Sequence, residues 1–214
     1  MFQTPPALPD QHSVLPMELH TPACEAKLLP QLRERTTSMI PAMRNKNYVQ
    51  LCWIVPDLEA SIGNWVKSTG AGPFFVFEDL HFEDSQYRGQ PSDIQPCRAA
   101  IGQFGETQIE LVSPTGAELG LWTELVPKGR LGFHHVGLYC TDYEAERAAY
   151  LADGSEMAFE GLMMGAKTCY IDTTPTLGFM TELITANPVA EMVFGQFKQA
   201  AEGWDGKDPI RTLG

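Results

Sequence analysis

The stretch "FHHVGLYCTDYE", residues 133–144, decides the fold because an earlier stretch, "VQLCWIVPDLE" at residues 49–59, follows the same order. Each contains a polar residue, a short apolar run typical of a strand, and an aspartate placed to cap a helix. The polar residues Gln50 and His135 are 85 positions apart, and the two aspartates show the same spacing. This constant spacing predicts that the chain contains two copies of one structural unit.

Each copy predicts the element order β-α-β-β-β, because strand-like runs surround one amphipathic helix. In the first copy the pattern places a strand at 48–55, a helix between Asp57 and Gly70, a strand at 72–84, a loop at 86–96 and a hairpin at 97–114 that turns near Gly105. In the second copy it places a strand at 133–140, a helix between Asp142 and Gly154, and strands at 155–164, 167–173 and 178–185. A last amphipathic helix begins at Pro188, and residues 205–214 are predicted to be a tail.

The pattern therefore predicts an α+β fold built from two tandem βαβββ modules. We expect four segments along the chain: a Pro-rich N-terminal arm at 1–45, a first module at 46–131, a second module at 132–187, and a C-terminal helix with its tail at 188–214. The arm either packs on the body or on a partner subunit, or is a loosely ordered tail.

The composition narrows the range of functions. The chain has 214 residues, 43% of them hydrophobic, and a formal net charge of −12. Nucleic acids and anionic membrane surfaces bind basic faces, so the charge argues against both as partners. No apolar stretch is long enough to cross a membrane. The five cysteines form no CxxC pair and the N-terminus lacks a secretory pattern, so we expect a reduced, cytoplasmic protein.

Alternation along the strands separates the polar residues from the packing faces. In the first strand the odd-numbered residues within 51–55 are bulky and apolar, so this face should pack under the helix and leave Gln50 on the other face. In the second copy the same parity places His135 on the open face. His134 then falls on the packing side or at the rim. His135 is therefore the counterpart of Gln50.

Glutamates occupy equivalent places in the last strand of each copy. Glu110 lies in "QIELVSP" and Glu182 in "MTELI", and each carboxylate is embedded in an apolar strand, where a charge without a partner is costly. Taken alone, either glutamate is typical of a solvated strand face, and His135 is typical of a hydrogen-bonded structural histidine. Their joint occurrence at matching positions favours a shared metal site.

The four positions are Gln50, Glu110, His135 and Glu182, and they offer one amide oxygen, two carboxylates and one imidazole. This donor set suits a divalent cation of borderline to hard character, such as Zn, Ni, Co, Mn or Fe(II). Four protein ligands leave positions of an octahedral site open for water or substrate, as a catalytic site requires.

The chain resembles the vicinal oxygen chelate superfamily, which contains glyoxalase I, methylmalonyl-CoA epimerase, extradiol dioxygenases and bleomycin-resistance proteins. The resemblance is carried by "QLCWIVPDLEAS", "QIELVSPTG", "GFHHVGLYCTD" and "MTELI", and it covers about residues 47–187. It implies that the two modules form a cupped mixed sheet around one metal. It also implies that the four residues named above are the ligands, with zinc as the first expectation.

The resemblance further implies a metal-dependent isomerase or lyase of the glyoxalase or epimerase type. In that chemistry a metal polarises a carbonyl, a carboxylate removes the neighbouring proton, and an enolate intermediate is reprotonated. Glu182 is the expected base and Glu110 its counterpart on the opposite face. Ile54 stands where glyoxalase I has a basic residue that binds glutathione. This difference argues against glutathione and leaves a small carbonyl compound or an acyl thioester as the expected substrate.

Other functions remain open. A metal-free protein that sequesters a ligand, as in the bleomycin-resistance branch, has no need of two inward carboxylates. A ring-cleaving dioxygenase uses two histidines and one carboxylate, so Gln50 counts against it. We also expect a homodimer. Arg88 and Arg98 are candidates to bind an anionic substrate group, although solvated loop charges are commoner. Candidates to line the pocket, or else plain core residues, are Tyr139, Met163, Met164 and Phe179.

Overall fold

The structure is a computed structural model that describes residues 48–80, 82–92, 97–116 and 120–212. The chain divides into two units, Met1–Met39 and Ile40–Gly214, and all described residues belong to the second. The predicted N-terminal arm at 1–45 lies outside the described residues. Among those residues, none of the helices has the length and apolar character needed to cross a membrane.

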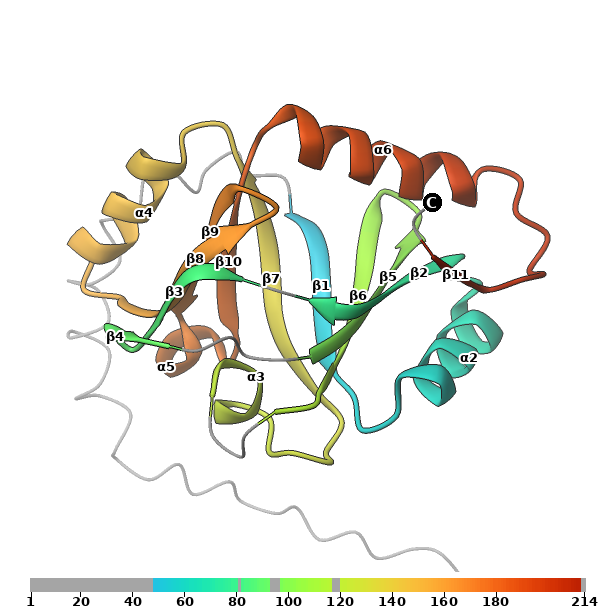
Figure 1. The fold of residues 1–214 in the computed structure, drawn as a ribbon, viewed down its shortest axis with the longest axis horizontal. Coiled ribbons are helices and arrows are strands. Elements are labelled where there is room, and N and C mark those ends of the chain that lie inside the picture. The colour runs from blue at the N-terminus through green and yellow to red at the C-terminus, as the bar shows by residue number, and fades with distance from the viewer. Residues whose placement is uncertain (1–47, 81, 93–96, 117–119, 213–214) are drawn as a thin grey trace, which may run out of the picture. The chain divides into compact units, whose positions relative to one another are not determined.

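The described chain shows the order β-α-β-β-β twice, with additions in each half (Figure 1). The first half contains β1 (Tyr48–Ile54), α2 (Leu58–Thr69), β2 (Phe74–Leu80), β3 (Glu83–Tyr87), β4 (Gln90–Pro91), β5 (Cys97–Phe104), β6 (Thr107–Pro114) and α3 (Leu121–Glu124). The second half contains β7 (Gly132–Cys140), α4 (Tyr143–Ala152), β8 (Glu156–Met163), β9 (Ala166–Asp172), α5 (Thr174–Leu177) and β10 (Met180–Thr185). Beyond it lie α6 (Pro188–Ala201) and β11 (Ile210–Thr212).

The predicted helix caps are confirmed. The side chain of Asp57 accepts a hydrogen bond from the backbone N–H of Ala60 at 2.9 Å, and Gly70 ends α2 with a φ of 75°. Asp142 accepts from the backbone N–H of Ala145 at 3.1 Å in α4. Each aspartate satisfies a donor that the first turn of a helix leaves open, and Gly70 adopts a left-handed conformation that a side chain would oppose.

The strands form one mixed sheet in the order β11-β2-β5-β6-β1-β7-β10-β9-β8-β3-β4. β1 and β7 pair antiparallel in its middle, with Gln50 opposite Gly137 and Cys52 opposite His135. At a spacing of 85 positions, His135 is the counterpart of Gln50 and Gly137 is the counterpart of Cys52. Gln50 thus pairs with the counterpart of Cys52, and Cys52 pairs with the counterpart of Gln50. The two modules are therefore related by a local two-fold axis between β1 and β7.

The sheet must curl strongly, because β2 leads directly into β3. Seven strands separate β2 from β3 in the sheet order, which in a flat sheet corresponds to roughly 38 Å at about 4.8 Å per strand. Only three residue steps join Leu80 at the end of β2 to Glu83 at the start of β3, and these span at most about 11 Å. The two sides of the sheet therefore approach each other, and β2 and β3 cross in front of β1 and β7 (Figure 1).

The apolar side chains pack on both faces of the curled sheet, as the strand parity predicts. On the outer face Trp53 packs in one cluster with Ile62 of α2, and Leu138 packs in another with Tyr150 of α4. The largest buried side chains of the inner cluster are Phe82, Trp122, Phe159 and Tyr170. The inner face also contains the polar residues singled out by the sequence.

Some predicted elements are wrong. The predicted loop at 86–96 contains the end of β3 and all of β4, since β3 pairs with β8 of the second module. The predicted tail at 205–214 contains β11, which pairs with β2. The short helices α3 and α5 were not predicted. β3 and β11 each pair with a strand that is distant in sequence, so local pattern alone gives no signal for them.

Candidate functional site

The four predicted site residues lie on four neighbouring strands, β6, β1, β7 and β10, and face the inside of the curled sheet. Their exposed fractions are 3% for Gln50, 5% for Glu110, 0% for His135 and 6% for Glu182. The structure thus brings all four together in a buried position.

The imidazole of His135 lies between two carboxylates. Its Nε2 atom is 3.3 Å from Oε2 of Glu110 and 3.2 Å from Oε2 of Glu182. The strand register accounts for part of this geometry, since Glu110 lies beside Cys52 on β1 and Cys52 lies opposite His135 on β7. Two buried carboxylates at one point require a compensating positive charge.

A glycine leaves room beside the amide of Gln50. Gly137 lies opposite Gln50 and beside Glu182 in the register. A Cβ atom at Gly137 would lie 3.2 Å from Oε1 of Gln50 and 3.2 Å from Cδ1 of Ile184, which is a tight contact. Nε2 of Gln50 donates a long hydrogen bond of 3.5 Å to Oε1 of Gln108. The carbonyl end of the Gln50 amide is therefore the end that remains to act as a ligand.

A chain of hydrogen bonds determines which nitrogen of His135 faces the carboxylates. Nε2 of His134 lies 3.0 Å from the backbone carbonyl of Leu121, and Nδ1 of His134 lies 2.9 Å from Nδ1 of His135. Burial and the neighbouring charge of His135 lower the pKa of His134 to about 3, so its ring is neutral. A carbonyl can only accept, so His134 donates from Nε2 and accepts at Nδ1. His135 consequently donates from Nδ1, and its Nε2 points to Glu110 and Glu182.

The two carboxylates determine the charge of His135. Burial by itself lowers the pKa of His135, but the close negative charges of Glu110 and Glu182 outweigh burial and raise this pKa to about 9. Without a cation, a protonated His135 balances part of the negative charge. A bound divalent cation would replace that proton.

The site residues fit a divalent cation. Oε2 of Glu110 and Nε2 of His135 are buried, and neither has a hydrogen-bond partner of good geometry within the described part of the chain. Two carboxylates, one imidazole nitrogen and one amide oxygen are donors that Zn²⁺ and other borderline divalent ions accept. A cation bound between these buried atoms would give each of them the partner that it lacks.

A second possible group of ligands lies next to the first. Sγ of Cys52 and one nitrogen each of His134 and His135 lie within 4.8 Å of one another and are buried. Burial, and then the charge of Glu110, raises the pKa of the Cys52 thiol well above its ordinary value. Metal binding needs the thiolate, and both nitrogens of His134 are already engaged. The carboxylate side of His135 is therefore the better cation site.

Two residues of β9 that the sequence analysis missed support Glu182. The hydroxyl of Thr168 lies 3.1 Å from Oε1 of Glu182 and 3.1 Å from the backbone carbonyl of Leu183. Tyr170 is opposite Glu182 in the register, and its ring contacts that of His135 at a centroid distance of 5.0 Å. Both residues are at even positions of β9, so strand parity combined with the pairing of β9 and β10 would have found them.

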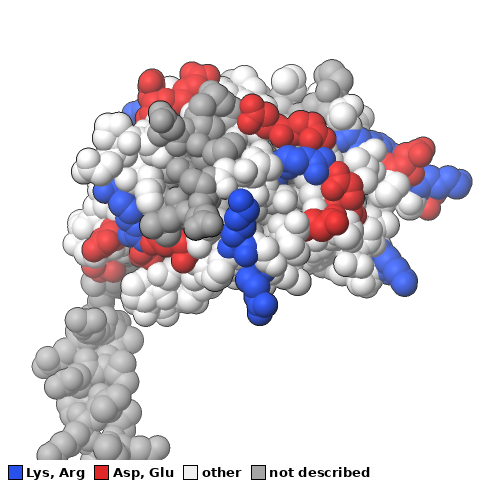
Figure 2. All heavy atoms as spheres, turned by 60° about the horizontal axis from the view of Figure 1, so that its bottom comes forward, with Lys and Arg blue, Asp and Glu red and all other residues white. Residues whose placement is uncertain are grey.

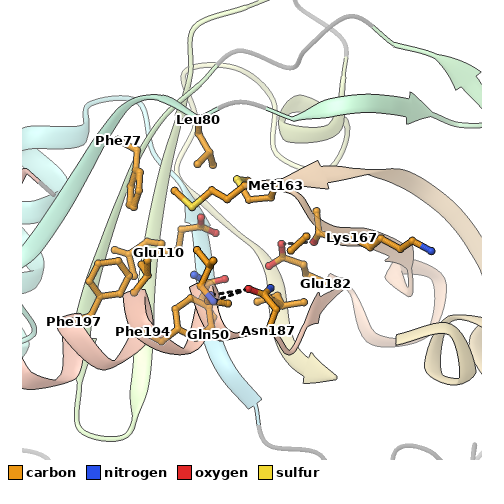
Figure 3. Close-up of a pocket in the computed structure, with 18 of the residues that line it drawn as sticks. Gln50, Phe77, Leu80, Glu110, Met163, Lys167, Glu182, Asn187, Phe194 and Phe197 are labelled. Carbon is orange, nitrogen blue, oxygen red and sulfur yellow. Dashed lines mark hydrogen bonds between the residues drawn. The ribbon is translucent and has the colours of Figure 1, made fainter. Parts of the chain in front are cut away.

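An apolar pocket adjoins the carboxylates. It has a volume of about 100 Å³, and Gln50, Glu110 and Glu182 reach it. Figure 3 shows the two carboxylates in the same space, with Met163 on one side and Phe194 of α6 on the other. The acidic groups therefore face a compartment with mostly hydrocarbon walls.

The candidate pocket residues divide into two groups. Met163 and Met164 line the pocket, whereas Tyr139 and Phe179 are not among the described residues that line it. Oη of Tyr139 instead accepts a hydrogen bond of 3.3 Å from the backbone N–H of Asn187. The ring of Phe179 packs on Phe133 at 5.4 Å.

The two arginine candidates are bound by carboxylates away from the pocket. Nη2 of Arg88 donates to Oδ2 of Asp172 at 2.6 Å, and Arg88 also donates to Glu124. Arg98 donates to Glu59 at 2.7 Å and to Glu78 at 2.6 Å. Neither arginine lines the pocket. On the face drawn in Figure 2 the described Lys and Arg residues are interspersed with Asp and Glu.

Comparison with known sequences gives one family. The model of the "Glyoxalase/Bleomycin resistance protein/Dioxygenase superfamily" matches residues 49–172, which is more than half of the chain. No curated protein matches the sequence.

Solved structures of epimerases show a similar fold. A methylmalonyl-CoA epimerase in complex with methylmalonyl-CoA and NH4+ has a TM-score of 0.50 and 22% identity, covering 67% of this chain and 96% of its own. The Mycobacterium tuberculosis methylmalonyl-CoA epimerase has a TM-score of 0.49 and 16% identity, with coverages of 68% and 91%. A variant of the Streptomyces coelicolor enzyme, in complex with 2-nitronate-propionyl-CoA, has a TM-score of 0.48 and 22% identity, with coverages of 65% and 96%.

Proposed function

The chain belongs to the glyoxalase/bleomycin resistance protein/dioxygenase superfamily, and we propose that it is a metal-dependent isomerase or lyase of the epimerase or glyoxalase type. Its reaction is removal and return of a proton beside a carbonyl group, through an enolate intermediate. One observation carries the proposal: Glu110 and Glu182 are buried on either side of His135 Nε2 and open into an apolar pocket. Inward carboxylates at this position are costly to bury unless a positive charge such as a cation compensates them.

The proposed ligands are Gln50 Oε1, a carboxylate oxygen of Glu110, His135 Nε2 and a carboxylate oxygen of Glu182. Zinc is the first expectation, and nickel, cobalt, manganese or iron are the alternatives. When bound, the cation supplies Lewis-acid polarisation of a carbonyl, which makes the adjacent C–H more acidic. The orphaned atoms Glu110 Oε2 and His135 Nε2 support this assignment.

Glu182 is the proposed base. The Thr168 hydroxyl holds its Oε1 atom at 3.1 Å, which leaves Oε2 to receive the proton from the substrate carbon. Glu110 lies on the other side of His135 Nε2. For epimerisation it would have to carry a proton while Glu182 is ionised, give that proton to the opposite face, and regain one from solvent after the product leaves. Return of the proton by Glu182 to a neighbouring atom gives isomerisation instead.

A metal-free protein that sequesters an apolar ligand is the second candidate, and the apolar pocket itself favours it. A ring-cleaving dioxygenase is a weaker candidate, because Gln50 occupies a position where that chemistry uses histidine. The expected substrate remains a small carbonyl compound or an acyl thioester.

The test combines metal analysis with proton exchange. The purified chain is loaded with Zn, Ni, Co or Mn, its metal content is measured, and carbonyl compounds are incubated with it in D2O and followed by NMR. We expect one metal per chain and deuterium uptake beside the carbonyl. Glu182→Gln should slow exchange by about 10²- to 10⁴-fold, whereas Glu160→Gln, whose carboxylate pairs with Arg147, should not. Absence of bound metal together with absence of exchange would overturn the proposal and favour the sequestering protein.

A further inference from the structure

One face of α6 closes a side of the pocket (Figure 3). The residues of α6 that line it are Val189, Ala190, Val193, Phe194 and Phe197. Their spacing is that of a single apolar helix face. Phe197 is buried against Phe75 of β2, with ring centroids 5.0 Å apart. The helix therefore contributes a continuous hydrocarbon wall next to the carboxylates.

α6 is fixed at both ends. At its start the side chain of Asn187 accepts hydrogen bonds from the backbone N–H groups of Val189 at 2.9 Å and Ala190 at 3.0 Å. After its end, β11 pairs with β2, and the backbone N–H of Phe74 donates to the carbonyl of Pro209 at 2.8 Å. Because both ends are anchored, the position of α6 beside the pocket is fixed by the rest of the fold.

Among the described residues, the pocket offers an anionic group no positive charge that is not already paired. The acidic and basic residues that line it are Glu110, Glu182 and Lys167. The Lys167 side chain is 60% exposed and is paired with Glu144. Coenzyme A carries several phosphate groups and glutathione carries carboxylates. Either molecule would be repelled by the acidic side chains of the pocket and by the formal net charge of −12 of the chain.

We propose that the substrate is an uncharged, apolar carbonyl compound whose hydrocarbon part lies against α6. This inference rests on the proposed function, and it narrows the substrate to a small aliphatic ketone, aldehyde or ester without a phosphate group or a peptide. The volume of about 100 Å³ is smaller than an apolar cavity of about 150 Å³ that binds benzene. The hydrocarbon part is therefore only a few carbon atoms long.

Two series of probes test the inference on the full chain. Straight-chain hydroxamic acids, from acetohydroxamic acid upward, present two adjacent oxygens and are titrated into the zinc-loaded protein by calorimetry. The 2-alkanones, from butanone upward, are titrated into the metal-free protein by tryptophan fluorescence. In both series we expect affinity to rise about fourfold per added methylene, until the cavity is full. Coenzyme A and glutathione should not compete.

Substitutions in α6 connect the effect to this wall. Val193→Ala enlarges the cavity and should move the best chain length upward by about one carbon, while Val193→Asp should abolish the dependence on chain length. The matched control is Met192→Asp, because Met192 is 58% exposed and does not line the pocket. Circular dichroism verifies that each variant is folded.

The outcomes separate this inference from the proposed function. If metal binds but affinity does not change with chain length, or if coenzyme A competes, the inference is wrong and the proposed function stands. If no metal binds, the proposed function fails, and the alkanone series still decides whether the wall selects apolar ligands.

Discussion

The Nδ1 atoms of His134 and His135 lie 2.9 Å apart, and this contact joins a histidine that lies between two carboxylates to one that is hydrogen-bonded to α3. The carbonyl of Leu121 fixes the hydrogen on His134, and His134 in turn fixes the hydrogen on His135. Nε2 of His135, which lies next to Glu110 and Glu182, is thereby kept available for a cation or a proton, although His134 itself contacts neither carboxylate in the described hydrogen bonds.

His134 should therefore control metal affinity. We expect His134→Ala to weaken zinc binding by about 10- to 100-fold, because the ring of His135 loses the acceptor that holds it. His134→Gln keeps an acceptor and should recover part of the affinity. Competition with a chromophoric chelator measures both constants. Equal affinities for the wild type and His134→Ala would show that the contact is only structural.

The raised pKa of His135 predicts an unusual pH dependence in the metal-free protein. The folded-state pKa of about 9 exceeds the ordinary value of 6.5, so the stabilisation is complete below pH 6.5 and is lost as the pH rises toward 9. The loss is about 3 kcal/mol at 1.36 kcal/mol per pKa unit. Urea unfolding in EDTA at pH 6, 7.5 and 9 measures it. His135→Gln should flatten this part of the profile.

Metal binding should show the opposite trend. The cation displaces the His135 proton, so affinity should rise with pH up to about 9. Calorimetry at pH 7 in buffers of different ionisation enthalpy counts the protons released. If no proton leaves on binding, His135 is not protonated beside the two carboxylates.

Gly137 should be needed for space and not for backbone conformation. Gly137→Ala brings a methyl group to 3.2 Å from Oε1 of Gln50, so we expect the amide to be displaced and zinc affinity to fall about tenfold. The control is Gly63→Ala in α2, where an added Cβ meets nothing within 4 Å and should stabilise by up to about 1 kcal/mol. Unchanged zinc binding in Gly137→Ala would remove Gln50 from the ligand set.

Arg88 should contribute to stability and not to substrate binding. Arg88→Met leaves the half-buried carboxylates of Glu124 and Asp172 without their partner, which should cost about 1 to 3 kcal/mol. Arg98→Met should cost less than about 1 kcal/mol, since its partners Glu59 and Glu78 are exposed. Denaturation and exchange kinetics are measured together. A change in KM for Arg88→Met with unchanged stability would contradict this assignment.

The duplicated fold and the four site positions could be predicted because strand periodicity carries both. Gln50 and His135 have the same parity within equivalent strands, and a period of two leaves only one face for each. The register of β1 with β7 then places His135 two positions from the partner of Gln50. The order of helices and strands, and the sheet face on which a strand residue lies, depend on the local sequence, so both can be predicted from it.

The remaining features depend on contacts between distant segments. The pattern of α6 shows an apolar face, but only the folded chain shows that Val193 and Phe194 face the pocket. Parity placed His134 on the packing side or at the rim, but the strand pairing is irregular there, and its ring lies inside the curled sheet beside Trp122 and Tyr170. Its hydrogen-bond partner, the Leu121 carbonyl, comes from α3, which was not predicted. β3 likewise forms only because β8 offers it an edge.

The direct step from β2 to β3 has a consequence for assembly. It adds a second connection between the halves, beyond the pairing of β1 with β7, and both are made within one polypeptide. A single molecule therefore contains all four residues of the proposed site. Even if two molecules associate, turnover per molecule should stay constant on dilution into the range where any dimer dissociates.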